Sequence, residues 1–127
     1  METTTQAKSH RDLIVWQKSM LLCKEIYKLT ETFPQREIYA LSSQMRRASV
    51  SIPSNIAEGR SRASKKDYAH FLQMAYGSSS ELETQLMISK DLSFCDDVAY
   101  QKIQALNTEI AKMLHVMIYK LNGASRS

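Results

Sequence analysis

Hydrophobic residues recur along the chain at alternating steps of three and four, the spacing that places side chains on one face of an α-helix. Four such stretches can be separated, and together they predict four helices of roughly 20–28 residues each. The stripe positions are Leu13, Trp16, Met20, Cys23 and Tyr27; Ile38, Leu41, Met45, Ala48, Ile52 and Ile56; Tyr68, Phe71, Leu72, Ala75, Leu82 and Leu86; and Ile103, Leu106, Ile110, Met113, Met117 and Leu121.

Residues that favour helix starts separate these stretches. Pro34 can open the second helix, because a proline in the first turn loses no helical hydrogen bond. Ser64 and Asp67 have the spacing of a capping box and predict the start of the third helix. Asp96 or Asp97 can cap the fourth helix through a side-chain oxygen.

The second and third helices carry three unusual positions. Pro53 interrupts the second helix, but the apolar stripe continues to Ile56, so we expect a kink rather than an end. Gly59 is expected to end this helix in the left-handed conformation. Gly77 lies in the middle of the third helix, where we expect it to allow a close approach of the second helix near Met45.

The joints between the predicted helices are only a few residues long, which makes sequential neighbours antiparallel. The predicted fold is all-α, an up-down-up-down antiparallel four-helix bundle that forms one domain over residues 12–122. We expect the segments 1–11 and 123–127 to be flexible ends.

Composition agrees with this class. The chain is 43% hydrophobic and 24% charged, and its 3 Gly and 2 Pro leave little material for the turns of an all-β fold. Cys23 and Cys95 form no Cys-x-x-Cys pair and are expected to be buried free thiols. With no apolar run of membrane length and no apolar core of a signal peptide near its start, the chain is expected to be cytoplasmic and to have no membrane partner.

Catalytic and metal-binding patterns are weak. Asp67 and His70 make the single acid-x-x-His pair, whereas diiron bundles use two such motifs. The serine run Ser78–Ser80 has no histidine nearby to activate it. Glu58, Glu81 and Glu83 are expected to be structural, because a narrow bundle offers no sugar cleft for paired carboxylates. We therefore expect a protein that is not an enzyme and that uses no metal, cofactor or small-molecule substrate.

Charge is distributed unevenly. Residues 1–66 carry a net charge of +6 and residues 67–127 one of −2, which favours an anionic partner for one part of the molecule. Six cations against one acid, Glu58, lie between positions 46 and 66. These candidate nucleic-acid-binding residues are Arg46, Arg47, Arg60, Arg62, Lys65 and Lys66.

Two alternatives remain open at these positions. Tyr68 or Phe71 can stack on a base, although packing in the core is the favoured interpretation. The cations can also be a merely solvated face, with Arg46 and Arg47 paired to Glu81 or Glu83 across the bundle.

The last two helices are apolar on more than one side. Met74, Tyr76, Met87 and Ile88 add a second face to the third helix, and the segment MLHVMIYKL is apolar almost all round the fourth. One subunit of this size cannot bury such a circumference, so we expect self-association through the fourth helix.

The segment SQMRRASVSIPSNIAEGRSRASKKDYAHFLQMAYGSSSELETQL, from Ser43 to Leu86, strongly resembles proteins encoded within intervening sequences of bacterial 23S rRNA genes. The segments DLIVWQKSMLLCKEIYKLTETFP and IAKMLHVMIYKLN are similar to the same family, so that the resemblance covers about residues 12–122. The serines after Gly77 depart from the family pattern, which often has a larger apolar residue there. The characteristic motif positions are Pro53, Asn55, Glu58, Gly59, Gly77 and Glu81.

This resemblance implies a homopentameric ring of four-helix bundles and a relation to accessory proteins of diversity-generating retroelements. We therefore expect a non-enzymatic, oligomeric scaffold that binds nucleic acid, in particular RNA, through the basic surface around the junction of the second and third helices. The alternatives are an accessory subunit that docks a reverse transcriptase, or a structural oligomer with no nucleic-acid role. A fold and a family are weaker grounds for an activity than a site.

Overall fold

The structure is a computed structural model that describes residues 9–123. It contains four long helices, α1 (Ile14–Glu31), α2 (Leu41–Arg60), α3 (Lys65–Asp91) and α4 (Asp97–Gly123). Two short 3-10 helices, η1 (His10–Asp12) and η2 (Gln35–Glu37), precede α1 and α2. Most of the two segments expected to be flexible, residues 1–8 and 124–127, lies outside the described residues.

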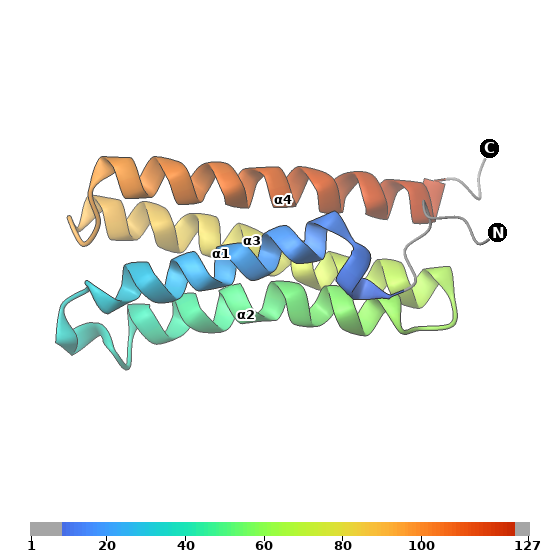
Figure 1. Ribbon diagram of the computed structural model, residues 1–127, viewed down its shortest axis with the longest axis horizontal. Helices are drawn as coiled ribbons and strands as arrows, with labels where there is room; N and C mark the ends of the chain where they lie inside the picture. The colour runs from blue at the N-terminus through green and yellow to red at the C-terminus, as the bar shows by residue number, and fades with distance from the viewer. Residues whose placement is uncertain (1–8, 124–127) are drawn as a thin grey trace.

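The long helices form an antiparallel bundle (Figure 1). Each helix packs against the one that follows it in the chain, and α4 closes the bundle by packing against α1. This confirms the prediction of an all-α protein of four sequentially adjacent helices. The start of α1, the end of α2, the start of α3 and the end of α4 therefore lie at the same end of the molecule.

The predicted stripe of α1 is correct at Leu13 and Trp16, which pack against the core, and is off by one position further along the helix. The side chains that α1 buries in the core belong to Val15, Leu22, Ile26 and Leu29, whereas Tyr27 is 42% exposed. Since α1 is apolar on more than one side, spacing alone could not tell which face turns inward. The packing of α2 and α4 on either side of α1 selects the face one residue further round.

The second helix begins later than predicted. Pro34 precedes η2 rather than opening α2, and Ile38 is exposed. At this end of the bundle Phe33 supplies the buried side chain, and its ring centroid lies 5.4 Å from that of Phe94. The chain thus inserts an extra turn before α2 starts at Leu41.

Neither glycine has the role expected of it. Gly59 lies inside α2 with an ordinary helical backbone, and a β-carbon placed on it would come within 2.8 Å of the Cβ of Phe71. A β-carbon on Gly77 would meet nothing within 4 Å. The close approach of α2 and α3 is therefore at Gly59, and the predictions of a glycine cap there and a tight contact at Gly77 are wrong.

The predicted starts of the third and fourth helices are confirmed. The Ser64 hydroxyl oxygen accepts a hydrogen bond from the Asp67 backbone N–H at 3.1 Å, at the start of α3. A carboxylate oxygen of Asp96 accepts one from the Ala99 N–H at 2.8 Å, at the start of α4. Helix α2 continues past the buried Pro53 to Arg60, as the apolar stripe predicts.

Among the described residues, none of the helices combines the length and apolar character that crossing a membrane requires.

Candidate nucleic-acid interface

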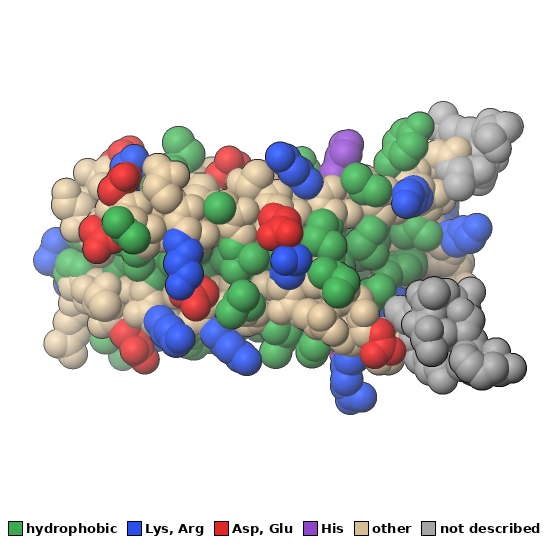
Figure 2. All heavy atoms as spheres, turned by 45° about the horizontal axis from the view of Figure 1, so that its top comes forward, with side chains coloured by type: hydrophobic (Ala, Val, Ile, Leu, Met, Phe, Trp, Pro, Cys, Tyr) green, Lys and Arg blue, Asp and Glu red, His purple; other side chains and the backbone are tan. Residues whose placement is uncertain are grey.

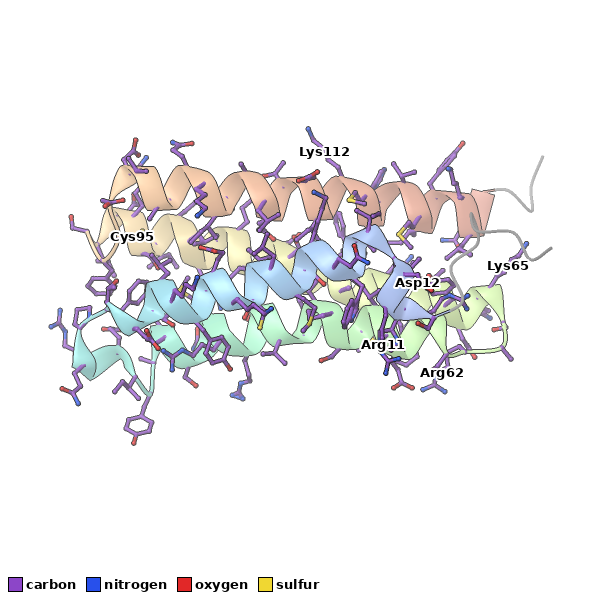
Figure 3. All side chains as sticks on the ribbon, viewed as in Figure 1. Arg11, Asp12, Arg62, Lys65, Cys95 and Lys112 are labelled. Atoms are coloured by element: carbon purple, nitrogen blue, oxygen red, sulfur yellow. The ribbon has the colours of Figure 1, made fainter. Side chains whose placement is uncertain are left out.

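Cations from three segments lie at the end of the bundle where the chain turns from α2 into α3. Figure 3 places Arg11, Arg62 and Lys65 at this end of the bundle, where η1 packs against α1 and α2. We call this surface the cationic end. Its members are Arg11, Arg60, Arg62, Lys65 and Lys66, and the carboxylates of the same segments are Asp12, Glu58 and Asp67.

The turn itself explains why these cations are displayed. Helix α2 ends at Arg60, where the Ser61 hydroxyl donates a hydrogen bond to the Glu58 carbonyl oxygen at 2.7 Å. The chain then reverses through a short exposed segment into the first turn of α3, which begins with Lys65 and Lys66. Both lysine side chains are exposed, as are all residues from 61 to 67.

Arg62 is held in place rather than free in solvent. Its Nη2 lies 2.7 Å from the Glu58 Oε2, and its guanidinium carbon lies 4.7 Å from the centroid of the Phe71 ring. An ion pair partly neutralises the arginine, and the ring contact adds a cation–π attraction. The Arg62 side chain is still 43% exposed.

The two aromatic candidates differ in their surroundings. Tyr68 packs against the hydrophobic core, and burial raises the pKa of its phenol, an effect that the nearby Arg60 partly offsets. Phe71 is half-buried, lies outside the core cluster and carries Arg62 over its ring. The favoured interpretation of both residues as core thus fits Tyr68 better than Phe71.

Arg46 and Arg47 lie elsewhere. Thirteen residues separate Arg47 from Arg60, about 20 Å along α2 at 1.5 Å per residue. The Arg46 Nε donates a hydrogen bond to the Thr30 hydroxyl oxygen at 2.8 Å, and its guanidinium lies 4.9 Å from the Tyr27 ring centroid. The six candidate cations therefore do not form one patch on a single subunit.

Arg46 does not make the expected ion pair with Glu81 or Glu83 on α3, because its side chain contacts α1 instead. Arg47 is exposed and lines a shallow hollow of about 400 Å³ between α2 and α3, together with Glu81. Glu83 lies on the other side of α3, in the groove that faces α4.

Two of the family motif positions make hydrogen bonds within their own helix, and one hydrogen bond between neighbouring serines joins α2 to α3. The Asn55 side-chain amide donates to the Ser51 carbonyl oxygen and to the Ser51 hydroxyl oxygen, each at 2.9 Å. The Ser78 hydroxyl bonds to the same Ser51 hydroxyl across the two helices at 2.9 Å. A carboxylate oxygen of Glu81 accepts from the Gln85 amide one turn later. These contacts are structural, as is the close approach at Gly59.

Sequence reasoning missed two residues. The sequence predicts a flexible end at Arg11, but two side chains form hydrogen bonds with its backbone in η1. The Ser9 hydroxyl oxygen accepts from the Arg11 N–H, and the Gln17 side-chain amide donates to the Arg11 carbonyl oxygen at 2.9 Å. Asn107 is a buried amide on α4 whose oxygen accepts from the Ser79 hydroxyl at 2.7 Å. The sequence feature that could have pointed to Asn107 is its position as a single amide between the apolar stripe residues Leu106 and Ile110.

A groove with a volume of about 600 Å³ lies between α3 and α4. The buried Ser79–Asn107 pair lies among its lining residues, with Glu83, Lys112 and His115 around it. Asp67 and His70, the pair with diiron spacing, are both exposed. Within residues 9–123, no three His, Cys, Asp or Glu side chains gather in a way that could hold a metal ion.

The two cysteines are free, but they are half-buried rather than buried. The pKa of the Cys95 thiol is raised, first by burial and then by the neighbouring Asp96 carboxylate, and Lys90 only partly offsets this. A thiol that resists ionisation at neutral pH is a poor nucleophile.

Exposed hydrophobic side chains are common on the bundle. On the face shown in Figure 2 they run along much of the long axis between charged side chains. Those on α3 and α4 include Met74, Tyr76, Met87, Ile88, Val98, Val116 and Tyr119. The second apolar face predicted for these helices is therefore present.

The fold and this surface together define a class: an all-α protein of four antiparallel helices with a cationic turn at one end. The chain belongs to the 23S rRNA-intervening sequence protein family, whose model matches residues 11–116. It is also similar to the crystal structure of a protein with unknown function from the S23 ribosomal protein family of Bacteroides thetaiotaomicron VPI-5482. That likeness has a TM-score of 0.76 and 27% sequence identity, and it covers 83% of this chain and 98% of the other. The comparison with curated proteins yields no match.

Proposed function

We propose that this protein is a non-enzymatic, oligomeric scaffold that binds RNA through the cationic end. The observation that carries the proposal is that η1, the end of α2, the α2–α3 turn and the start of α3 lie at one end of the bundle and carry five cations, Arg11, Arg60, Arg62, Lys65 and Lys66. The exposed lysines among them can neutralise phosphates and release the counterions that phosphates hold.

Binding at this end follows the RNA backbone. The cations lie around the junction of α2 and α3 at one end of the bundle rather than along the length of one helix, which favours contact with phosphates over base reading. Contacts of this kind are weak singly, so assembly of several subunits into one particle raises the affinity by presenting several cationic ends to the same RNA. The proposed oligomer draws on the exposed hydrophobic side chains of α3 and of residues 113–121 in α4, which leaves Val98 outside the interface.

The test is a fluorescence anisotropy titration of labelled RNA at several salt concentrations. The quadruple variant R60Q/R62Q/K65Q/K66Q is expected to bind more weakly and with a flatter salt dependence. The slope of log K against log salt becomes shallower by about 0.7 in a single strand, or 0.9 in a duplex, for every phosphate that the variant no longer neutralises.

A matched control removes four cations from the other half of the bundle, with the variant K24Q/K28Q/R36Q/K102Q. It lowers the net charge by the same amount and is expected to leave the salt slope close to that of the parent protein. Equal slopes for both quadruple variants would show that binding follows net charge rather than this surface. Absence of RNA binding at low salt would remove the proposal altogether.

A second candidate function, docking of a protein such as a reverse transcriptase, is favoured by a different surface. Tyr27, Ile38, Tyr39 and Val50 surround a hollow of about 640 Å³ between α1 and the start of α2, with Arg46 and Arg47 at its edge. Tyr39 is 96% exposed. Substitution of Tyr39 by Ser should weaken such docking without changing RNA binding.

A further inference from the structure

Arg62, a member of the cationic end, lies beside an aromatic ring that is not part of the core. Its guanidinium covers the Phe71 ring at 4.7 Å, and the Glu58 carboxylate fixes it from the side at 2.7 Å. We call these three residues the Arg62 stack. We propose that the Arg62 stack is a platform for an unpaired nucleobase, so that the RNA bound at this end is single-stranded there. This inference rests on the proposed function.

The charge of Arg62 is the first reason. A carboxylate at 2.7 Å already compensates the guanidinium, so Arg62 contributes less to phosphate neutralisation than Lys65 or Lys66. The same carboxylate leaves the flat side of the guanidinium unused by hydrogen bonds, because a guanidinium donates in its own plane. Nucleobases stack on the planes of arginine side chains and on aromatic rings.

The position of the Phe71 ring is the second reason. Gly59 allows α3 to approach α2 so closely that a β-carbon there would lie 2.8 Å from the Phe71 Cβ and 3.2 Å from the Tyr68 carbonyl oxygen. This contact sets Phe71 at the corner of the bundle directly beside the turn that carries Arg62. The His70 ring meets the Phe71 ring at 76° with centroids 5.6 Å apart, which adds a further flat group at the same corner.

The surroundings of the stack are the third reason. Lys65 and Lys66 lie three and four residues after Arg62 and are exposed in the first turn of α3. A strand whose base rests on the Arg62 stack can therefore place neighbouring phosphates near two lysines. An aromatic or guanidinium surface combined with cations along the backbone path is the usual arrangement for binding single strands without sequence preference.

The same chemistry occurs at the opposite end and provides a matched control. The Arg36 guanidinium lies 5.9 Å from the Phe94 ring centroid, and its Nε lies 4.0 Å from a Glu37 carboxylate oxygen. That end also carries Glu31, Asp91, Asp96 and Asp97, which repel phosphate. Arg36 thus has an aromatic and an acidic neighbour at an end where acidic side chains outnumber cations.

The experiment measures anisotropy with a labelled oligouridylate of about twelve nucleotides, a length that spans typical single-strand sites, and with an RNA duplex of the same length. A duplex has the higher charge density, so charge alone favours the duplex. The wild-type protein is expected to bind the single strand at least as tightly as the duplex.

The variant R62K keeps the positive charge and removes the planar group. It is expected to weaken binding of the single strand on the order of tenfold, with an unchanged salt slope and unchanged duplex binding. F71L, which keeps an apolar side chain but no ring, is expected to do the same, while R36K leaves both affinities unchanged. Far-UV circular dichroism confirms that each variant is folded.

Equal single-strand affinities for R62K and the wild-type protein would overturn the stacking platform, and so would a wild-type preference for the duplex. Either result leaves the proposed function standing as long as the quadruple Gln variant still loses binding. If the wild-type protein binds neither RNA at low salt, the proposed function fails and the platform fails with it.

Discussion

At the scale of single residues, Gly59 does the most to shape the candidate interface. The backbone and Cβ atoms that face it belong to Tyr68 and Phe71, so the absence of a side chain at Gly59 sets how closely α3 approaches α2. Gly77, in the middle of α3, faces open space, and the conformational freedom of its backbone destabilises the helix. Identical residues thus have opposite consequences, and only their neighbours distinguish them.

These surroundings predict opposite effects of alanine. Gly59→Ala should lower the free energy of unfolding by about 1–3 kcal/mol, because Cβ and backbone atoms cannot move aside as a flexible side chain can. Gly77→Ala should raise it by about 0.5–1 kcal/mol, because alanine restricts the unfolded chain and favours the helix. Urea denaturation at one protein concentration measures both. A destabilising Gly77→Ala would contradict the open surroundings of that residue.

At the scale of helices, polar contacts fix how neighbours align. Asn107 on α4 accepts from the Ser79 hydroxyl and donates to the Ser79 carbonyl oxygen at 3.0 Å, and both residues are buried. Hydrophobic packing tolerates sliding, but a buried pair of this kind is satisfied in one register only. It sets the alignment of α3 and α4, and so the shape of the groove between them.

The turn from α3 to α4 is also defined by backbone chemistry. Ser93 adopts the left-handed conformation with φ 62, its N–H bonds the Lys90 carbonyl oxygen, and the Phe94 N–H bonds the Ser89 carbonyl oxygen at 2.8 Å. This is the Schellman arrangement that usually employs glycine. The Phe94 ring then covers the end of the core beside Phe33.

The Ser79–Asn107 pair predicts a non-additive pair of substitutions. Asn107→Ala should cost about 1–3 kcal/mol of unfolding free energy, because the buried Ser79 hydroxyl loses its acceptor. In the Asn107→Ala variant, Ser79→Ala should lower the free energy of unfolding by less than it does in the wild-type protein, since it removes a hydroxyl that already lacks its partner. Urea denaturation of the four proteins gives the coupling. The exposed Thr108→Ala serves as a control and should change stability by about 0.5 kcal/mol or less.

At the scale of the whole molecule, the two ends of the bundle carry side-chain charges of opposite excess. The cationic end opposes an end where Glu31, Glu37, Asp91, Asp96 and Asp97 outnumber Lys28, Arg36 and Lys90. Antiparallel neighbours cancel most of the helix dipoles, so the side chains produce this difference. A particle built from several such subunits in one orientation would collect the cations on one side, where the proposed RNA binds.

Assembly through α4 gives the last prediction. The wild-type protein should scatter light at micromolar concentration as a particle several times heavier than the 14.5 kDa chain. Val116→Glu, at a side chain that is 49% exposed in the α3–α4 groove, should shift the particle toward the single subunit by placing a charge in the interface. Val98→Glu, at the start of α4 and 80% exposed, should not. A particle mass equal to one chain for the wild-type protein would contradict the proposed oligomer.

The sequence by itself determined the helical class, the number of helices and most of their starts. These depend on local rules: apolar spacing, a serine or aspartate that caps an N–H, and short joints that force antiparallel neighbours. The candidate cations of the α2–α3 turn were also visible, because residues 60–66 are close in the chain and no packing was needed to bring them together.

Only the tertiary structure decided which face of α1 is buried, which glycine lies at the close approach and which cations share a surface. Each depends on residues distant in the chain: Tyr68 and Phe71 against Gly59, or η1 packed against α2 so that Arg11 lies at the same end as the α2–α3 turn. Periodicity records how side chains repeat round one helix but not which neighbour each will meet, because that choice is made by the packing of all four helices at once.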